Sequence, residues 1–155
     1  MKEEKRIAKI LVKKKLTLAV AESCTGGLIS DRITNISGSS KFFKGGVIAY
    51  SNDIKTSFLN VPKTVIKKHG AVSGQVARSM AKGARKAMNA DIAVSITGIT
   101  GPTGGTKVKP VGLAYMAFSS EQKGSSRKVL LKKADRIELK NQFTQAVFKL
   151  ISDNI

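Results

Sequence analysis

The stretch LTLAVAESCTGG, residues 16–27, decides the expected fold because a short apolar run ends abruptly in polar side chains and a glycine pair. An apolar run of this length, bounded by charged and glycine residues, is typical of a buried strand. The pattern that follows is helical from about Thr25 to Ile36. A strand that leads directly into a helix is the repeating unit of α/β domains.

The rest of the chain continues this alternation and then changes to an antiparallel pair of strands. Ser73 and Asp135 are expected to act as N-caps of two later helices, because their side-chain oxygens can accept from the first-turn N–H groups. The 155 residues predict one layered α/β domain spanning residues 1–155, without internal repeats. The further elements expected are helices at 2–15, 52–59, 62–68, 74–88 and 136–150, and strands at 45–51, 91–98, 111–118 and 127–132.

Composition limits the class of protein. The formal charge is +18, from 28 basic and 10 acidic residues, but no aromatic residues interleave with the lysines to stack bases. We read the charge as a lysine-rich surface that binds polyanions weakly at low salt. No segment approaches the roughly 20 apolar residues of a membrane span, and the charged N-terminal stretch does not resemble a secretory signal. A single cysteine and no Cys/His cluster predict a cytoplasmic protein without disulfide or metal.

Two glycine-rich loops follow buried strands, and ligands of open α/β sheets bind beyond the carboxyl ends of such strands. In ESCTGG, residues 22–27, Thr25, Gly26 and Gly27 are candidates for binding an anion at a helix N-terminus. In GITGPTGG, residues 98–105, the candidates are Gly101, Gly104 and Gly105. Neither loop has P-loop or dinucleotide-binding spacing. The alternative is that both loops are only tight turns.

A third segment, SGSSKFFKGGVIAYSNDIK, residues 37–55, contains groups suited to catalysis. Lys55 falls in the first turn of an expected helix, where the helix dipole disfavours a positive charge, and burial would lower its pKa further. A neutral lysine can deprotonate a serine or tyrosine hydroxyl, so Ser40 and Tyr50 are its candidate partners. The alternative is that Lys55 is a solvated surface lysine.

Four segments resemble the CinA C-terminal domain family, also called PncC: AESCTGG, GSSKFFKGGVIAYSNDIK, HGAVS and ITGITGPTGGTKVKPVGLAYMAF. They occur in the family's order, and the resemblance covers nearly the whole chain. It implies a three-layer α/β/α sandwich with a mixed, mostly parallel central sheet. It also implies a homo-oligomer, most simply a dimer, in the stand-alone form of the family. The implied activity is deamidation of nicotinamide mononucleotide to the nicotinate form and ammonia, without a cofactor.

The same resemblance suggests roles for individual residues. Ser40 is expected to be the nucleophile, with Tyr50 and Lys55 accepting its proton and Ser23 assisting. Glu22 either contacts the substrate's ribose or ring cation, or shapes its own loop by hydrogen bonds.

Further positions are assigned by the same resemblance or depart from the family pattern. Arg136 is expected to contact phosphate or, alternatively, to be a surface charge. Cys24 is a rival nucleophile that we prefer as a buried loop residue, and His69 is expected to order a turn. Ala134 and Lys140 stand where the family commonly has glycine and arginine, and Lys140 lacks bidentate geometry. The contrasting hypothesis is a non-catalytic, basic nucleotide- or DNA-associated protein linked to competence or DNA damage.

Overall fold

A five-stranded mixed sheet in the order β2-β1-β3-β4-β5 forms the centre of the computed structural model, which describes residues 3–132 and 134–155. Strands β2, β1 and β3 are parallel, β4 runs against β3, and β5 runs against β4. Four of the five strands therefore share one direction, as the family resemblance implies. The strands are β1 (Leu18–Glu22), β2 (Phe43–Ile48), β3 (Ile92–Gly98), β4 (Leu113–Ser120) and β5 (Gly124–Leu130).

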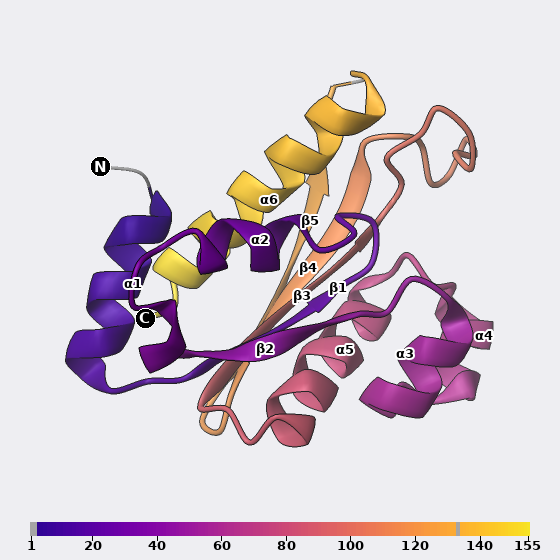
Figure 1. The fold of residues 1–155 in the computed structure, drawn as a ribbon. Helices are drawn as coiled ribbons and strands as arrows, with labels where there is room; N and C mark the ends of the chain where they lie inside the picture. The colour runs from indigo at the N-terminus through magenta and orange to yellow at the C-terminus, as the bar shows by residue number, and fades with distance from the viewer. Residues whose placement is uncertain (1–2, 133) are drawn as a thin grey trace.

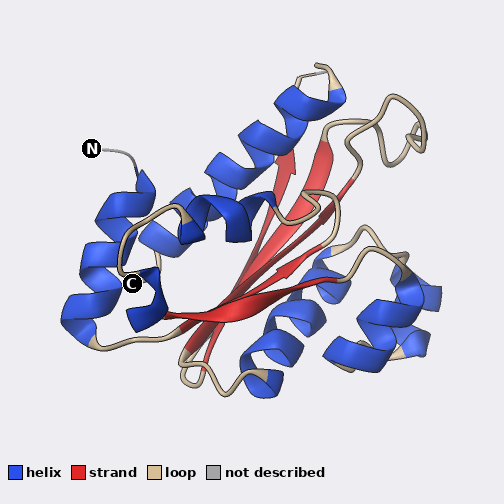
Figure 2. Cartoon of the chain, viewed as in Figure 1, coloured by secondary structure: helices blue, strands red, loops and turns tan. Residues whose placement is uncertain are grey.

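Helices cover both faces of the sheet and complete the predicted three-layer sandwich (Figures 1 and 2). One layer holds α1 (Glu3–Lys14), α2 (Leu28–Thr34) and α6 (Arg136–Ser152). The other holds α3 (Asn52–Leu59), α4 (Lys63–His69) and α5 (Gly74–Ala87). A short 3-10 helix, Ser39–Lys41, precedes β2. Lys2, where the sequence places the start of the first helix, lies outside the described residues.

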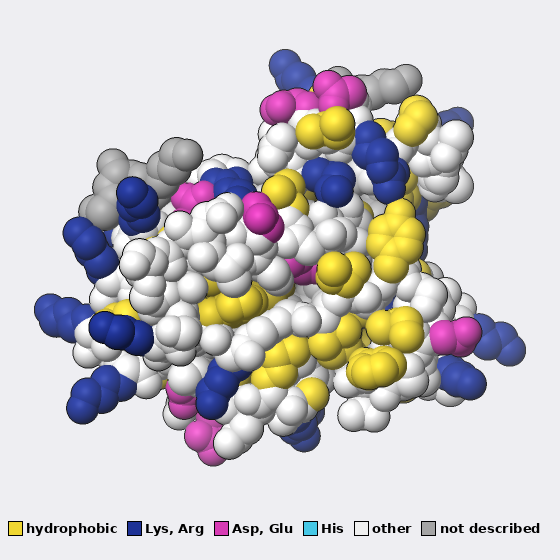
Figure 3. Space-filling model, viewed as in Figure 1, with side chains coloured by type: hydrophobic (Ala, Val, Ile, Leu, Met, Phe, Trp, Pro, Cys, Tyr) yellow, Lys and Arg dark blue, Asp and Glu magenta, His cyan; other side chains and the backbone are white. Residues whose placement is uncertain are grey.

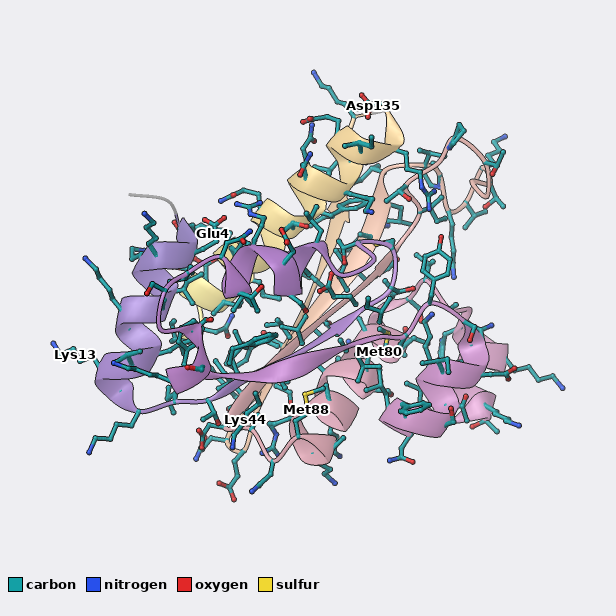
Figure 4. The ribbon with its side chains drawn as sticks, viewed as in Figure 1. Glu4, Lys13, Lys44, Met80, Met88 and Asp135 are labelled. Atoms are coloured by element: carbon teal, nitrogen blue, oxygen red, sulfur yellow. The ribbon has the colours of Figure 1, made fainter. Side chains whose placement is uncertain are left out.

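Local signals account for most helix ends. The Ser73 hydroxyl accepts from the N–H of Val76, and the Asp135 carboxylate accepts from the N–H of Glu138, so both expected N-caps are confirmed (Figure 4 labels Asp135). The second helix begins at Leu28 rather than Thr25. Gly26 and Gly27 have φ angles of 62° and 101°, which are outside the helical region, so the helix starts after them.

The two faces of the sheet bury separate apolar clusters. Between the sheet and the α1, α2 and α6 layer lie larger side chains, including Phe143 and Phe148. On the other face small alanines of β1 and β3 pack against Val76 and Met80 of α5 (Figure 4 labels Met80). Close approach of α5 to the end of α3 depends on Gly83, because a Cβ there would overlap the carbonyl oxygen of Leu59. In the described chain, no helix is long and apolar enough to span a membrane.

Candidate active site

A pocket of about 340 Å³ opens beyond the carboxyl ends of β1, β2 and β3. Its lining residues come from segments that are far apart in the sequence: 23–24, 50–55, 71–72, 97–104 and Arg136. The sequence predicts a ligand crevice beyond the carboxyl ends of the strands, and the pocket lies there. The parallel direction of these strands brings the segments together, because parallel strands end at the same edge.

Lys55 and Ser23 form the closest pair of reactive groups in this pocket. The Lys55 Nζ lies 3.1 Å from the Ser23 Oγ, within hydrogen-bond distance. Ser23 follows the last residue of β1, and Lys55 lies in α3, which begins four residues after β2. Both side chains are buried, with exposed fractions of 8% for Ser23 and 2% for Lys55. The pair is therefore positioned by the ends of the adjacent parallel strands β1 and β2, which lead into Ser23 and into α3.

The surroundings of Lys55 favour its neutral form. Its Nζ donates to the carbonyl oxygens of Ala49, at 2.8 Å, and Tyr50, at 3.3 Å. Burial lowers the pKa of Lys55 from its ordinary value, because a charged ammonium loses hydration there. A neutral amine has two N–H groups for the two carbonyls and one lone pair for the hydroxyl of Ser23. The geometry thus suits Lys55 as a base acting on Ser23.

Ser40 does not join this pair, and its predicted activation by Lys55 is wrong within a single chain. Ser40 lies in the 3-10 helix before β2, whereas Tyr50 and Lys55 follow the end of that strand. The six residues of β2 separate the two positions by about 20 Å, at the usual rise of about 3.3 Å per residue. The exposed Ser40 therefore lies near the amino ends of the parallel strands, whereas the pocket lies at their carboxyl ends.

Tyr50 reaches the pocket in a different way from the one expected. Its carbonyl, rather than its hydroxyl, contacts Lys55, so a proton relay through the phenol has no contact to support it. The Tyr50 hydroxyl accepts from the Arg136 guanidinium at 2.9 Å, and the ring is 61% exposed. Arg136 also donates to the carbonyl oxygen of Gly101 at 2.6 Å. Arg136 therefore joins α6, the second glycine loop and Tyr50 at the pocket mouth.

The rival nucleophile is inactive in these surroundings. The Cys24 side chain is 5% exposed, and burial raises the pKa of its thiol to about 12. The thiol is therefore protonated at neutral pH and is a poor nucleophile. His69 lies at the end of α4 outside the pocket, where its carbonyl accepts from Lys109 Nζ at 2.7 Å. Both observations agree with the sequence-based preference for structural roles.

Glu22 has the structural role that the sequence left open as an alternative. Its carboxylate is fully buried and accepts hydrogen bonds from the N–H groups of Gly27, Ile29 and Ser30. It also accepts from the Thr25 and Ser30 hydroxyls, at 2.6 and 2.8 Å.

These contacts correct the predicted anion site at the start of α2. The N–H groups expected to bind a ligand already donate to Glu22. Glu22, Thr25, Gly26 and Gly27 are not among the residues lining the pocket. The two glycines instead provide the left-handed turn that folds the loop around the carboxylate.

The second glycine loop does border the pocket. Gly101 and Gly104 line it, both at positive φ, whereas Gly105 does not. A Cβ at Gly105 would lie 2.8 Å from the Val111 backbone nitrogen, so this glycine permits the loop to fold back on itself. The sequence-based reasoning missed Thr97, which lines the pocket and donates to the Ala71 carbonyl oxygen at 2.9 Å. Thr97 could have been identified from the sequence by its position near the end of a buried strand, just before the glycine loop.

One potential oxyanion donor was also missed. Within the described residues, the backbone N–H of Cys24 makes no hydrogen bond to another residue. It belongs to the residue after Ser23, the position that supplies an oxyanion donor in many serine hydrolases. The same part of the chain contains no group of three His, Cys, Asp or Glu side chains that could hold a metal ion.

Relatives share both the sequence and the fold. A CinA-like protein of Syntrophus aciditrophicus (strain SB) is 45% identical over 148 residues, covering 96% of this chain and 35% of that protein. Another, from Dictyoglomus thermophilum, is 56% identical over 115 residues, covering 74% of this chain and 28% of that protein. The chain spans about a third of the length of the curated relatives it matches.

Solved structures agree closely with this fold. The competence/damage inducible protein CihA of Agrobacterium tumefaciens is 33% identical with a TM-score of 0.91, covering 97% of this chain and 94% of that one. A CinA superfamily protein of Escherichia coli is 25% identical with a TM-score of 0.94, covering 99% and 88%. The family model described as the CinA C-terminal domain matches residues 1–155. This chain therefore belongs to the CinA C-terminal domain family.

Proposed function

We propose that this chain hydrolyses the carboxamide of nicotinamide mononucleotide to nicotinate mononucleotide and ammonia. The observation that carries the proposal is the 3.1 Å contact between Lys55 Nζ and Ser23 Oγ in a buried pocket. A serine hydroxyl beside a neutral lysine is a known nucleophile and base pair for acyl transfer. The nucleophile proposed is thus Ser23 rather than Ser40.

The reaction divides into acylation and deacylation. Ser23 Oγ attacks the amide carbon while Lys55 takes the hydroxyl proton, and the carbonyl oxygen becomes an oxyanion near the N–H of Cys24. When the tetrahedral intermediate collapses, the C–N bond breaks and protonated Lys55 gives its proton to the departing nitrogen, releasing ammonia. Water then attacks the ester with Lys55 as base. The C–O bond to Ser23 breaks, protonated Lys55 returns the proton to Ser23 Oγ, and the acid product leaves.

The pocket mouth suits the other parts of this substrate. Arg136 carries a permanent positive charge and has N–H groups beyond the two that contact Tyr50 and Gly101, so it is a candidate for the phosphate. The exposed ring of Tyr50 offers a face to the cationic pyridinium. A neutral Lys55 avoids repulsion of that cation, which a charged lysine would impose.

The test is ammonia release from nicotinamide mononucleotide by purified single variants. Ser23→Ala should lower kcat by about 10³-fold or more, because the nucleophile is lost. Ser40→Ala and Cys24→Ala should keep kcat within about tenfold of the parent chain, since neither group attacks the amide. Turnover by Ser23→Ala together with an inactive Ser40→Ala would contradict the assignment.

The non-catalytic alternative is distinguished by the parent chain itself. A salt titration with duplex DNA should show binding that weakens steeply with salt and is negligible at physiological ionic strength. Tight binding under those conditions, with no ammonia release from a panel of carboxamide nucleotides, would favour a nucleic-acid-associated role instead.

A further inference from the structure

The basic side chains of this protein are unevenly distributed over its surface. On the face drawn in Figure 3, hydrophobic side chains gather over β2 and α3, and Lys and Arg side chains lie mainly around the margin. A second pocket, of about 480 Å³, lies where the first turn of α5 meets β4 and β5, and it is lined by several cations. We call it the α5 pocket, and we call the pocket that contains Ser23 and Lys55 the catalytic pocket.

The cations of the α5 pocket come from three separate segments. Arg78 belongs to α5, Lys109 follows the second glycine loop, and Lys128 belongs to β5. Hydrogen bonds position two of them: Arg78 Nη1 donates to Ser126 Oγ at 2.7 Å, and Lys109 Nζ donates to the His69 carbonyl oxygen at 2.7 Å. The tertiary structure therefore brings these charges together, although they are up to 50 residues apart in the sequence.

No negative charge balances these cations. The lining of the α5 pocket contains no Asp or Glu, and Arg78, Lys109 and Lys128 take part in none of the ion pairs of the described residues. Like charges that converge on one concave surface repel one another, most strongly where the walls exclude water. A bound anion would offset this repulsion, so the pocket favours a negatively charged ligand.

Neutral hydrogen-bond donors line the same pocket. The Ser73 hydroxyl caps the N–H of Val76, whereas the N–H groups of Gly74 and Gln75 make no hydrogen bond within the described residues. Tyr115 also lines the pocket and carries a hydroxyl donor. The donors thus come from a helix, a loop and two strands. Phosphate oxygens are arranged tetrahedrally and accept from several directions, so this set suits phosphate better than a planar carboxylate.

We propose that the α5 pocket binds the phosphate group of a small organic molecule, with Arg78, Lys109 and Lys128 around the phosphate. Its volume lies within the range of about 300–1,000 Å³ that is usual for small-molecule sites, and leaves room for an organic group beside the phosphate. The site is separate from Arg136, the candidate phosphate ligand of the catalytic pocket. Phosphate binding in the α5 pocket does not depend on the proposed amidase activity.

The two pockets share a wall. Val72 lines both of them. Thr97 lines the catalytic pocket, donates to the Ala71 carbonyl oxygen, and pairs in the β3–β4 ladder with Tyr115 of the α5 pocket. A ligand of the α5 pocket therefore contacts the segment that borders the reaction site. Two sources of phosphate fit this geometry: a separate phosphorylated molecule, or a substrate that extends from one pocket past Val72 into the other.

Binding is tested first on the unaltered chain, with inorganic phosphate as the probe. Phosphate is titrated into the isotope-labelled protein at constant ionic strength, which removes general screening from the comparison. The amide signals of Gly74, Gln75 and Lys109 should shift and saturate. Signals that do not saturate, or shifts confined to Gly101 and Gly104 near Arg136, overturn the proposal.

Variants then identify the cations that hold the phosphate. The Kd read from the Gly74 and Gln75 signals should rise about fivefold or more in Lys109→Gln, because a charge-assisted contact is lost. Lys107→Gln is the matched control: it removes the same charge from the same loop at an exposed residue outside the pocket, and should change the Kd less than about twofold. Arg78→Gln should weaken binding as Lys109→Gln does, and it leaves the loop intact. Unchanged binding in both variants, or equal weakening by Lys107→Gln, overturns the proposal.

Nicotinamide mononucleotide distinguishes the two sources of phosphate, and this arm alone rests on the proposed function. The phosphate titration is repeated on Ser23→Ala, which leaves the nucleotide intact, with the nucleotide at saturation. A separate ligand predicts a phosphate Kd within about twofold of the value without nucleotide. An extended substrate predicts that the nucleotide itself shifts the Gly74 and Gln75 signals and raises the apparent phosphate Kd more than about tenfold by competition. Either result supports the site. Absence of ammonia release from the parent chain rejects the proposed function and leaves the phosphate titration to decide the site.

Discussion

Replacing Glu22 by glutamine separates the two roles that this carboxylate has been given, structural anchor and substrate ligand. The carboxylate is fully buried and accepts five hydrogen bonds, three of them from backbone N–H groups of the turn and first turn of α2. Glutamine has the same shape but only one accepting oxygen. Whichever way the amide is oriented, its NH2 group faces a backbone N–H that then has no acceptor.

The cost follows from these contacts. If the amide oxygen takes the side that meets Thr25, Gly27 and Ile29, the Ser30 N–H at 2.9 Å is left unpaired, at about 1–3 kcal/mol. The three remaining bonds lose their charged acceptor, at about 0.5–1 kcal/mol each. We expect Glu22→Gln to lower the free energy of unfolding by about 3–5 kcal/mol, which is a large part of the total for a domain.

Urea unfolding followed by circular dichroism measures this directly. The midpoint should fall with an unchanged m value, and the melting temperature should drop by about 10 °C. Glu138→Gln is the control, because Glu138 is exposed on α6 and should change stability by less than about 0.5 kcal/mol. A Glu22→Gln loss below about 1 kcal/mol, with a large rise in KM in the folded enzyme, would refute the structural reading.

Lys55 and Gly83 provide the remaining tests. Lys55→Met should abolish turnover and raise the melting temperature at neutral pH, because it removes a buried amine whose pKa is lowered by burial. In the parent chain, kcat/KM should fall as pH decreases through that lowered pKa, because Lys55 becomes protonated. The free energy of unfolding should rise with pH between the lowered pKa and about 10.4, because in this interval the unfolded chain binds more protons than the folded chain. A pH-independent rate would contradict this. Gly83→Ala should destabilise the fold by about 1–3 kcal/mol, measured by urea unfolding, since the added methyl overlaps the Leu59 carbonyl.

Much of the fold follows from short-range patterns. Strand and helix order, the caps at Ser73 and Asp135, and the ligand crevice at the carboxyl ends of the strands all depend on local spacing and strand direction. The start of α2 was misplaced by three residues, because the turn at Gly26 and Gly27 reads as part of a helical pattern until its φ angles are known.

The partner of Lys55 was harder to predict, because the serine nearer to it in the sequence is not the one nearer to it in space. Ser40 is closer to Lys55 along the chain than Ser23 is, yet β2 carries it to the other end of the sheet, while the parallel pairing of β1 and β2 brings Ser23 to the lysine. The two roles considered for Glu22 could not be distinguished from the sequence, because neither its inward orientation nor the three backbone N–H groups that donate to it can be read from the letters ESCTGG.

The burial of Lys55 affects which surface substitutions the protein can accept during evolution. Its hydrogen-bond partners are neutral oxygen atoms, and loss of hydration is the main cause of its lowered pKa. Exterior charges more than about 8–10 Å away are largely screened at physiological salt, and no surface lysine or arginine is among the causes of the lowered pKa. Lineages can accumulate surface lysines, as this chain has, or lose them, without retuning the amine at the centre of the pocket.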